Sequence, residues 1–448
     1  MKVPKLVRDP GPAQSAIPSA IPSAIPSGIG RRQAISLAIT ALGGTALAAC
    51  SSGSARSTSS SHVTLNMWGF ADLSKPLVQQ YERAHRGVTI QTKISDYDAS
   101  HQTLLTALAS GKGPDIAQIA IDYMGEFVAH ASAFTDLRKL GASSLKSEYL
   151  AWRWNGGVAS DGSIVGIPTD VGGMAIAYRT DLFAKAGLPT DPAAVGALWP
   201  TWEDYIDTGK KYVAATGKKF IDSGKAVFRA ESNQGDLKYV DSGGKPVYDT
   251  NPQIRKSWHD GVAAIDAGLS ANVATYTPQW DAVVANGTVA TLIVPAWMLT
   301  QVEQQAPGTK GKWNIAVLPG KIGNDGGSFL AIPNNAPHAK EAYDFIKWLE
   351  APAQQLALFK ENNTFPTTPA LYTDPAVTHL TNPFFSNAPV GKIYIASVQG
   401  MRPHPVGPED RIIENQFENG LGRVDQGSQS GTASWSQVMS DVERELQG

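Results

Sequence analysis

The chain from His62 onward alternates hydrophobic and polar residues in short blocks that predict regular structure. Val63, Leu65 and Met67 occupy every second position, which predicts a strand. An amphipathic helix pattern follows in "KPLVQQYERAHRG". The strand pattern then returns in "VTIQTKISD", the helix pattern in "HQTLLTALASGKG", and the strand pattern in "PDIAQIAID". Strand, helix, strand, helix and strand at this spacing predict a parallel, doubly wound sheet.

A second set of patterns occupies the middle of the chain. Two extended runs flank Gly172 and Gly173 in "GSIVGIPTDVGGMAIAYRTDL", and two glycines there suit a crossover between lobes, where backbone torsions change freely. "PTWEDYIDTGKKYVAATG" predicts a helix capped by Thr201 and closed near Gly217. "WDAVVANGTVATLIVPAWM" predicts a helix, a strand and a turn that presents Trp297. The chain therefore continues as α/β structure well past the first sheet.

The N-terminal stretch predicts an export signal, residues 1–49, that includes a disordered Pro-rich extension. It holds the repeat "AIPSAIPSAIPSG", a pair of arginines, and an apolar run over residues 34–49 that is too short to span a bilayer. Its end, "LAAC", resembles a bacterial lipobox, which implies lipidation of Cys50. The arginine pair leaves both the Sec and the twin-arginine route open. The alternative for Cys50 is an ordinary buried thiol.

The polar residues 50–61 predict a lipid-anchored flexible linker. Cys50 is the single cysteine of 448 residues, so no intramolecular disulfide can form. A formal net charge of −2 gives no basic excess, which argues against nucleic-acid binding.

The sequence lacks the common catalytic and cofactor motifs. It has no HExxH, no G-x-S-x-G, no P-loop and no G-x-G-x-x-G, and its eight histidines show no metal-ligand spacing. We therefore expect no metal, no cofactor and no enzymatic activity. A lipid-anchored glycoside hydrolase remains an alternative, because Asp96 and Asp170 could supply the two carboxyl groups that such an enzyme needs.

Five stretches resemble the extracellular sugar-binding proteins of bacterial ABC importers, the maltose-binding-protein-like family. They are "SGKGPDIAQI", "GIPTDVGGMAIAYRTDLFAKAGL", "ATLIVPAWML", "KWNIAVLPG" followed by "GGSFLAIPNNAPHAKEAYDFIKWL", and "TFPTTPAL". They occur in the family's order and spacing, and the resemblance covers roughly residues 63–446. One departure is Pro295, which stands where the family usually has glycine before the tryptophan of its "G-S-W-M" turn.

This resemblance implies a two-lobed periplasmic-binding-protein-like fold of type II, with a doubly wound sheet in each lobe and a hinge between them. Lobe one would comprise residues 62–170 and 322–371, and lobe two residues 171–321 and 372–448. The second crossover would fall near "LPGKIGNDGG". The protein would bind a sugar or short oligosaccharide in the cleft, as a monomer. It would be anchored to the outer face of the cell membrane and deliver its ligand to the permease subunits of an ABC transporter.

A sugar site needs aromatic platforms for the CH faces of the rings and charged or amide groups for the hydroxyls. Strand ends and the family's motifs supply the candidates, although core packing, helix caps and surface ion pairs are the ordinary alternatives. The expected ligand-binding residues are Trp68, Asp96, Tyr97, Asp122, Tyr123, Asp170, Trp280, Trp297, Gly327, Phe365 and Arg402. Six tryptophans that lie inside helical or strand patterns are expected in the core: Trp152, Trp154, Trp202, Trp258, Trp313 and Trp348. Peptides or polyamines as ligands, and a surface sensor without transport, stay open as rival functions.

Overall fold

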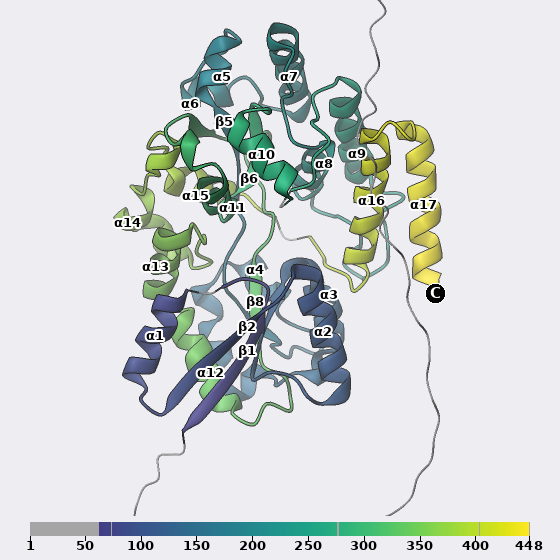
Figure 1. Cartoon of the computed structure of the whole chain (residues 1–448). Coiled ribbons are helices and arrows are strands. Elements are labelled where there is room, and N and C mark those ends of the chain that lie inside the picture. The colour runs from purple at the N-terminus through teal and green to yellow at the C-terminus, as the bar shows by residue number, and fades with distance from the viewer. Residues whose placement is uncertain (1–61, 73, 276, 403, 448) are drawn as a thin grey trace, which may run out of the picture. The chain divides into compact units, whose positions relative to one another are not determined.

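The computed structural model describes residues 62–72, 74–275, 277–402 and 404–447 (Figure 1). The expected export signal, the linker and the lipidation site at Cys50 lie outside these residues. Within the described ranges no helix has the length and apolar character that a membrane crossing requires.

A five-stranded sheet in the order β2-β1-β3-β8-β4 forms the centre of the first lobe. Its strands are β1 (Val63–Gly69), β2 (Val88–Ile94), β3 (Ile116–Ala120), β4 (Gly166–Pro168) and β8 (Ser328–Ala331). The parallel pairing predicted for the first three strands is confirmed, because β1 runs parallel to both β2 and β3. β8 is antiparallel to β3 and β4. It enters the sheet from the other lobe, so it runs away from the edge at which β3 and β4 end.

The helices next to this sheet include the two predicted between its first three strands. These helices are α1 (Lys75–Ala84), α2 (Tyr97–Ser110), α3 (Ile121–Ala129), α4 (Ala151–Gly156) and α12 (Ala339–Leu349). α3 and α4 are additions to the helices predicted from the sequence. α2 closes at Gly111 in the left-handed conformation, as its sequence predicts. Successive side chains of β3 pack into two different hydrophobic cores. Ile116 belongs to one core, and Ala117 and Ile119 belong to the other. The sheet is therefore covered on both faces at β3, which explains the continuous burial of this central strand.

The second lobe contains a three-stranded sheet in the order β6-β5-β7. β5 (Met174–Arg179) is antiparallel to both β6 (Thr291–Pro295) and β7 (Trp313–Ala316). β5 leaves the crossover and runs outward, whereas β6 and β7 return toward it. This sheet is also covered on both faces, because Ala175 and Ala177 join one core while Met174 and Ile176 join another. Two covered sheets confirm the predicted two-lobed α/β fold.

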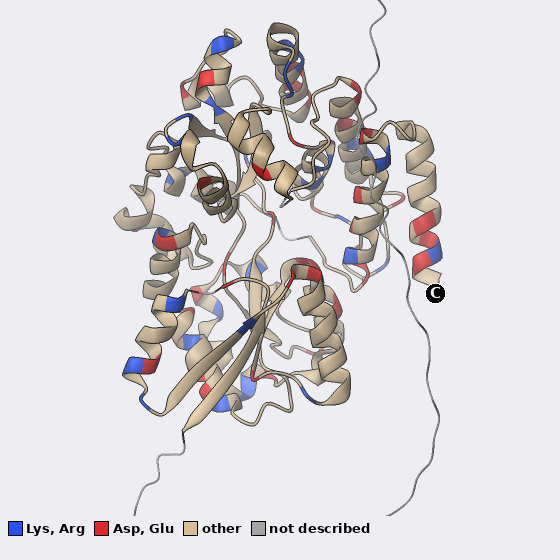
Figure 2. Ribbon diagram, in the orientation of Figure 1, with Lys and Arg blue, Asp and Glu red and all other residues tan. Residues whose placement is uncertain are grey.

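The remaining α-helices within the described residues all follow β5 in the chain. They are α5 (Thr180–Lys185), α6 (Pro192–Gly196), α7 (Trp202–Thr216), α8 (Gly224–Ser232), α9 (Pro252–Asp266), α10 (Pro278–Asn286), α11 (Met298–Gln305), α13 (Pro352–Asn362), α14 (Pro375–Thr378), α15 (Val390–Gln399), α16 (Asp410–Asp425) and α17 (Gly431–Gln447). The predicted cap at Thr201 is present as a full capping box, and Gly217 closes the helix. Lys and Arg are interspersed with Asp and Glu along the helices, as on α17 (Figure 2).

Two chain segments connect the sheets, and they lie against each other. The first joins β4 to β5 through Gly172, and the second joins β7 to β8 through Asp325. The Asp325 amide donates to the Gly172 carbonyl at 2.8 Å. A Cβ at Gly172 would collide with the Asp325 carbonyl oxygen. Gly172 is not among the positive-φ residues, so close backbone approach requires glycine here, and not the torsional freedom that the sequence suggested.

Candidate functional site

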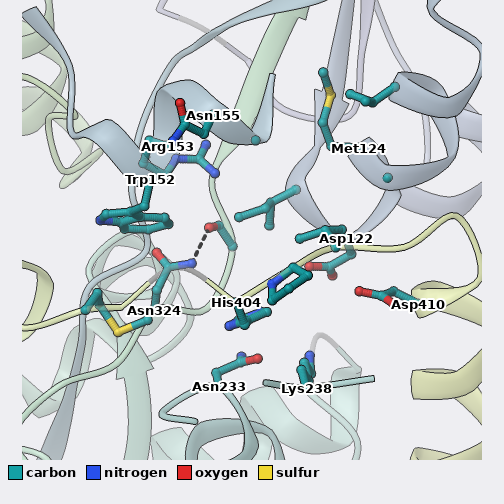
Figure 3. A pocket seen from close by; sticks show the side chains of 18 of the residues that line it. Asp122, Met124, Trp152, Arg153, Asn155, Asn233, Lys238, Asn324, His404 and Asp410 are labelled. Atoms are coloured by element: carbon teal, nitrogen blue, oxygen red, sulfur yellow. Dashed lines mark hydrogen bonds between the residues drawn. The ribbon is translucent and has the colours of Figure 1, made fainter. Parts of the chain in front are cut away.

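A cavity of about 360 Å³ lies between the two sheets and is walled by both lobes (Figure 3). α3 and α4 line it from the first lobe. The residues that follow α8, the second crossover, the segment before α16 and α16 itself line it from the other side. We call it the interlobe cavity. Its charged and amide side chains are Asp122, Arg153, Asn155, Asn233, Lys238, Asn324, Arg402, Asp410 and Glu414.

The first-lobe wall depends on two helix starts. Asp122 stands in the first turn of α3, directly after β3, so the carboxyl end of a central strand aims it at the cavity. α4 is only six residues long and carries Trp152 and Arg153. Trp152 is half-buried and is the one tryptophan among the described residues that line the cavity. Its indole Nε1 has no hydrogen-bond partner among the described residues.

Arg153 is the most deeply buried cation of this wall, with 1% of its surface exposed. Its Nη2 donates to the Ser328 carbonyl at 2.9 Å, and its guanidinium lies 4.4 Å from the Phe329 ring centroid. Burial lowers its pKa to about 10, and the nearby Asp170 charge opposes that shift, so Arg153 is cationic at neutral pH. Nε and Nη1 are buried and make no hydrogen bond within the described residues, so both donors are unsatisfied in this arrangement.

The opposite wall holds a buried ion pair. Lys238 Nζ lies 3.0 Å from Glu414 Oε1, and both side chains are less than 10% exposed. Burial alone would raise the pKa of Glu414. Lys238, Arg229 and Arg411 outweigh burial and lower this pKa to about 2. Glu414 is therefore ionised, and the charge of Lys238 is already matched.

Two further acids on the cavity wall, Asp122 and Asp410, form no such ion pair within the described residues. Burial, reinforced by the Glu414 charge, raises the pKa of Asp122 although Arg229 and Lys238 oppose the shift. Burial also raises the pKa of Asp410 to about 7, since Lys238 and the Gly407 backbone offset it only in part. The neighbouring His404 is neutral at pH 7, because burial lowers its pKa to about 4.

The raised pKa of Asp410 makes the free energy of unfolding depend on pH, and the variant Asp410→Asn tests this dependence. The pKa of Asp410 is raised from 3.8 to about 7 on folding. Its contribution to stability is complete below pH about 4 and is lost as the pH rises to about 7. Between pH 5 and pH 7.5, Asp410→Asn should therefore gain about 2 kcal/mol of unfolding free energy relative to wild type. Urea unfolding at both pH values measures this gain, and an unchanged difference between the two proteins would contradict it.

The lobes touch beside the cavity through side chains that span the gap. Arg411 on α16 lies 3.2 Å from Asp98 on α2, and its guanidinium lies over the rings of Tyr97 and Tyr123 at 5.9 and 5.6 Å. Arg229 on α8 binds Asp325 in the crossover at 2.7 Å. The arrangement is thus one in which both lobes enclose the cavity.

The backbones of the two lobes also come close to each other beside the cavity. A Cβ on Gly125 of α3 would collide with the carbonyl oxygen of Gly407 in the other lobe. Residue 125 must therefore be small for the lobes to meet at this distance, whereas a Cβ on Gly407 would collide with Val240 of its own lobe.

Asp122 and Arg402 are the two sequence-predicted residues that line the cavity. Arg402 also forms an exposed ion pair with Asp236 at 3.1 Å. Tyr97 and Tyr123 lie behind the wall: Tyr97 donates to Asp122 at 3.1 Å, and Tyr123 donates to Asp98 at 2.6 Å.

Three predicted residues cluster at the crossovers. Trp297 Nε1 donates to the Asp325 carbonyl at 3.0 Å. Asp170 accepts from the Ser328 amide at 2.9 Å, and the Gly327 carbonyl accepts from the Ile121 amide at 2.9 Å. Their polar groups organise the connection between the lobes.

The remaining predicted residues lie elsewhere. Asp96 is exposed and caps α2, and Trp68 packs beside Lys93, whose Nζ lies 4.6 Å from the ring centroid. The expectation that Trp280 and Phe365 reach the ligand is corrected, because both are fully buried. Trp280 donates to the buried Asp222 at 2.9 Å, and Phe365 packs edge-on against Phe359. Neither side chain offers surface to a ligand in this arrangement.

The structure adds Trp152, Arg153, Lys238, His404, Asp410 and Glu414, which the sequence did not single out. Trp152 was expected in the core because it lies in a helical pattern. Residues two apart on a helix point to different sides, and here Trp154 takes the core position at 3% exposure while Trp152 turns outward. The alternation in "WRW" was the signal available. The described residues contain no group of three or more His, Cys, Asp or Glu side chains that could hold a metal ion.

Comparison with known proteins places the chain in a family. The model of the bacterial extracellular solute-binding proteins matches residues 76–384. A crystal structure described as an extracellular solute-binding protein of family 1 aligns with a TM-score of 0.78 at 36% identity, over 85% of this chain and 99% of the other. The chain belongs to the bacterial extracellular solute-binding protein family, which confirms the resemblance seen in the sequence.

Two relatives of this chain are named for the sugars that they bind. An arabinooligosaccharide-binding protein of Halalkalibacterium halodurans is 25% identical over 304 residues, which are 63% of this chain and 66% of the relative. A lactose-binding protein of Rhizobium radiobacter is 25% identical over 309 residues, 62% of this chain and 67% of the relative. The matches thus span about two thirds of the length of these relatives.

Proposed function

We propose that this protein is the substrate-binding component of an ABC-type importer and that it captures a sugar or short oligosaccharide in the interlobe cavity. The observation that carries the proposal is a cavity walled by both lobes of a solute-binding protein, with an indole and several hydrogen-bonding groups on its surface. Its volume of about 360 Å³ lies in the usual range of small-molecule sites. The arabinooligosaccharide- and lactose-binding relatives support carbohydrate as the ligand class.

The cavity offers both kinds of contact that a sugar needs. The ring of Trp152 supplies a flat apolar surface for the CH face of a pyranose. The two remaining donors of Arg153 can hydrogen-bond sugar hydroxyls, and the amides of Asn155 and Asn233 lie on the same cavity surface. An unpartnered buried donor costs free energy. A sugar hydroxyl that hydrogen-bonds to Arg153 would remove this cost and so stabilise the complex.

The family is extracellular, and the finer details of location are part of this proposal. Lipidation of Cys50 would hold the protein at the outer face of the membrane on the tether of residues 50–61, beside the permease. The hinge would separate lobe one, residues 62–170 and 322–371, from lobe two, residues 171–321 and 372–448. The protein would act as a monomer, after export by the Sec or twin-arginine route.

A thermal-shift screen of the full chain with Cys50→Ser, which cannot be acylated, tests the proposal. Mono- and oligosaccharides, peptides and polyamines are compared as ligands. A matching saccharide at about 100 times its Kd should stabilise the protein by about 2.7 kcal/mol and remain chemically unchanged. A shift with peptides or polyamines but with no saccharide would contradict the proposed ligand class. Hydrolysis of the saccharide would contradict the binding-protein role.

A further inference from the structure

Two carboxylates on the cavity wall, those of Asp122 and Asp410, lack a cationic partner among the described residues. The hydrogen bond that Asp122 receives comes from a neutral group, the Tyr97 hydroxyl. Asp410 is 7% exposed, and its Oδ1 has no hydrogen-bond partner within the described part of the chain. A buried carboxylate without a partner is costly, so a group that supplies positive charge would be bound strongly here.

The cations nearest to these acids are already engaged. Lys238 is bound to Glu414 at 3.0 Å, Arg229 to Asp325 at 2.7 Å, and Arg411 to Asp98 at 3.2 Å. Glu414 and Glu418 add further negative charge from α16, at 3.9 Å from Arg411 and 3.6 Å from Arg229. Among these groups six carboxyl groups face three cations. Arg402, a fourth cation on the cavity wall, is paired with Asp236, and the neutral His404 does not change the balance.

The two ends of the cavity differ in chemistry (Figure 3). Asp122 and Asp410 appear on one side of the view, and Trp152 with Arg153 on the opposite side. All four line the same cavity. A ligand that lies across it meets an indole and a guanidinium at one end and two carboxylates at the other.

We propose that the preferred ligand is a saccharide that carries a basic amino group, with its ammonium bound by Asp122 and Asp410 and a sugar ring against Trp152. This inference rests on the proposed function and names its substrate class. An ammonium donates three hydrogen bonds and matches the charge of the acids, whereas a hydroxyl supplies no charge. An anionic sugar would be repelled at this end. Glu414 and His404 also line the cavity, but no three His, Cys, Asp or Glu side chains among the described residues are grouped so that they could hold a metal ion.

The raised pKa values of Asp122 and Asp410 give the inference a distinctive signature. Near pH 7 Asp410 is partly protonated, and a bound ammonium favours its ionised form. Binding of an amino sugar should therefore release protons, whereas binding of the corresponding neutral sugar should not. Glu414, Glu409, Lys238 and His404 surround Asp410, but Glu414 stays ionised and His404 neutral through this range.

Isothermal titration of the full chain with Cys50→Ser tests the inference at pH 6.5. Glucosamine, galactosamine, mannosamine and chitobiose are each compared with the hydroxyl counterpart: glucose, galactose, mannose and cellobiose. We expect at least one amino sugar to bind about tenfold more tightly than its counterpart, which corresponds to 1.4 kcal/mol. Repeating the titration in buffers of different ionisation enthalpy measures the released protons.

Variants of Asp122 and Asp410 then test whether these two residues cause the preference for amino sugars. Asp410→Asn and Asp122→Asn should each abolish the amine preference and the proton release. The matched control is Asp344→Asn, an exposed residue that pairs with Lys340 on α12 and should preserve both. If a variant folds poorly, the comparison of amino sugars with their hydroxyl counterparts on the protein with both aspartates intact still tests the inference.

Failure of the inference and failure of the proposed function give different results. If saccharides bind but no amino sugar exceeds its hydroxyl counterpart, the inference is overturned and the proposed function stands. If no saccharide of either kind binds and spermidine does, the proposed function fails and the inference with it. Binding of Ca²⁺ that Asp410→Asn abolishes would show that the acids serve a metal and would also overturn the inference.

Discussion

Trp152→Ala is expected to weaken the binding of the cognate saccharide by about 10- to 100-fold. Burying an aromatic side chain contributes about 1.5–3 kcal/mol, and Trp152 is the indole that the interlobe cavity presents to a ligand. Because the side chain is half-buried and lies at the end of a short helix, the fold should tolerate its removal. Isothermal titration measures the affinity, and thermal unfolding without ligand checks the fold.

Trp68→Ala is the matched control for this experiment. Trp68 is also half-buried and also lies at the end of a secondary-structure element, but it packs beside Lys93 and does not line the cavity. Its removal should leave the affinity within about twofold. The opposite ranking, with Trp68 essential and Trp152 dispensable, would move the site to the end of β1, where the sequence alone placed it.

Gly125→Ala is expected to weaken binding by a similar factor through a different cause. A methyl group at this position would collide with the Gly407 carbonyl oxygen of the facing lobe. Such overpacking costs about 1–3 kcal/mol, or about 10- to 100-fold in affinity, when ligand binding requires the lobes to meet as they do here. The proposed hinge lets the lobes separate without ligand, and alanine is favoured over glycine within a helix by about 1 kcal/mol. The melting temperature without ligand should therefore stay equal or rise while the affinity falls.

Gly87→Ala provides the control for the added methyl group. Nothing lies within 4 Å of a Cβ placed on Gly87, so both stability and affinity should stay close to wild type. If Gly125→Ala binds the saccharide as tightly as the wild-type protein, then the arrangement of the lobes seen here is not the one that holds the ligand.

The fold could be predicted from the sequence to a large extent, because the spacing of hydrophobic residues along strands and helices leaves a strong pattern. β1, β2 and β3 with their helices follow directly from the alternation of hydrophobic residues. The antiparallel direction of β8 could not be read in this way, since it depends on where the chain re-enters the first lobe. The reason for glycine at position 172 was likewise hidden, because it is set by the distant backbone of Asp325.

The site was predicted less well, since the cavity is formed by segments that are far apart in the chain. Asp122 was expected at the site because it follows a central strand, where ligands collect, and it lines the cavity. Trp280 and Phe365 were misplaced because an aromatic residue near a turn can equally well fill the core, and both do. Asp410 and Lys238 have no local signal. Their significance arises only when α16 and the residues after α8 come together around the cavity.

A crystal structure of the protein with the tightest saccharide from the screen tests the central claim most directly. The account predicts the sugar in the interlobe cavity, with one ring against Trp152 and with hydrogen bonds to Arg153 and to the acids of the opposite wall. A sugar seated instead at Trp68 or at Trp297, with the cavity beside Trp152 left to solvent, would contradict it.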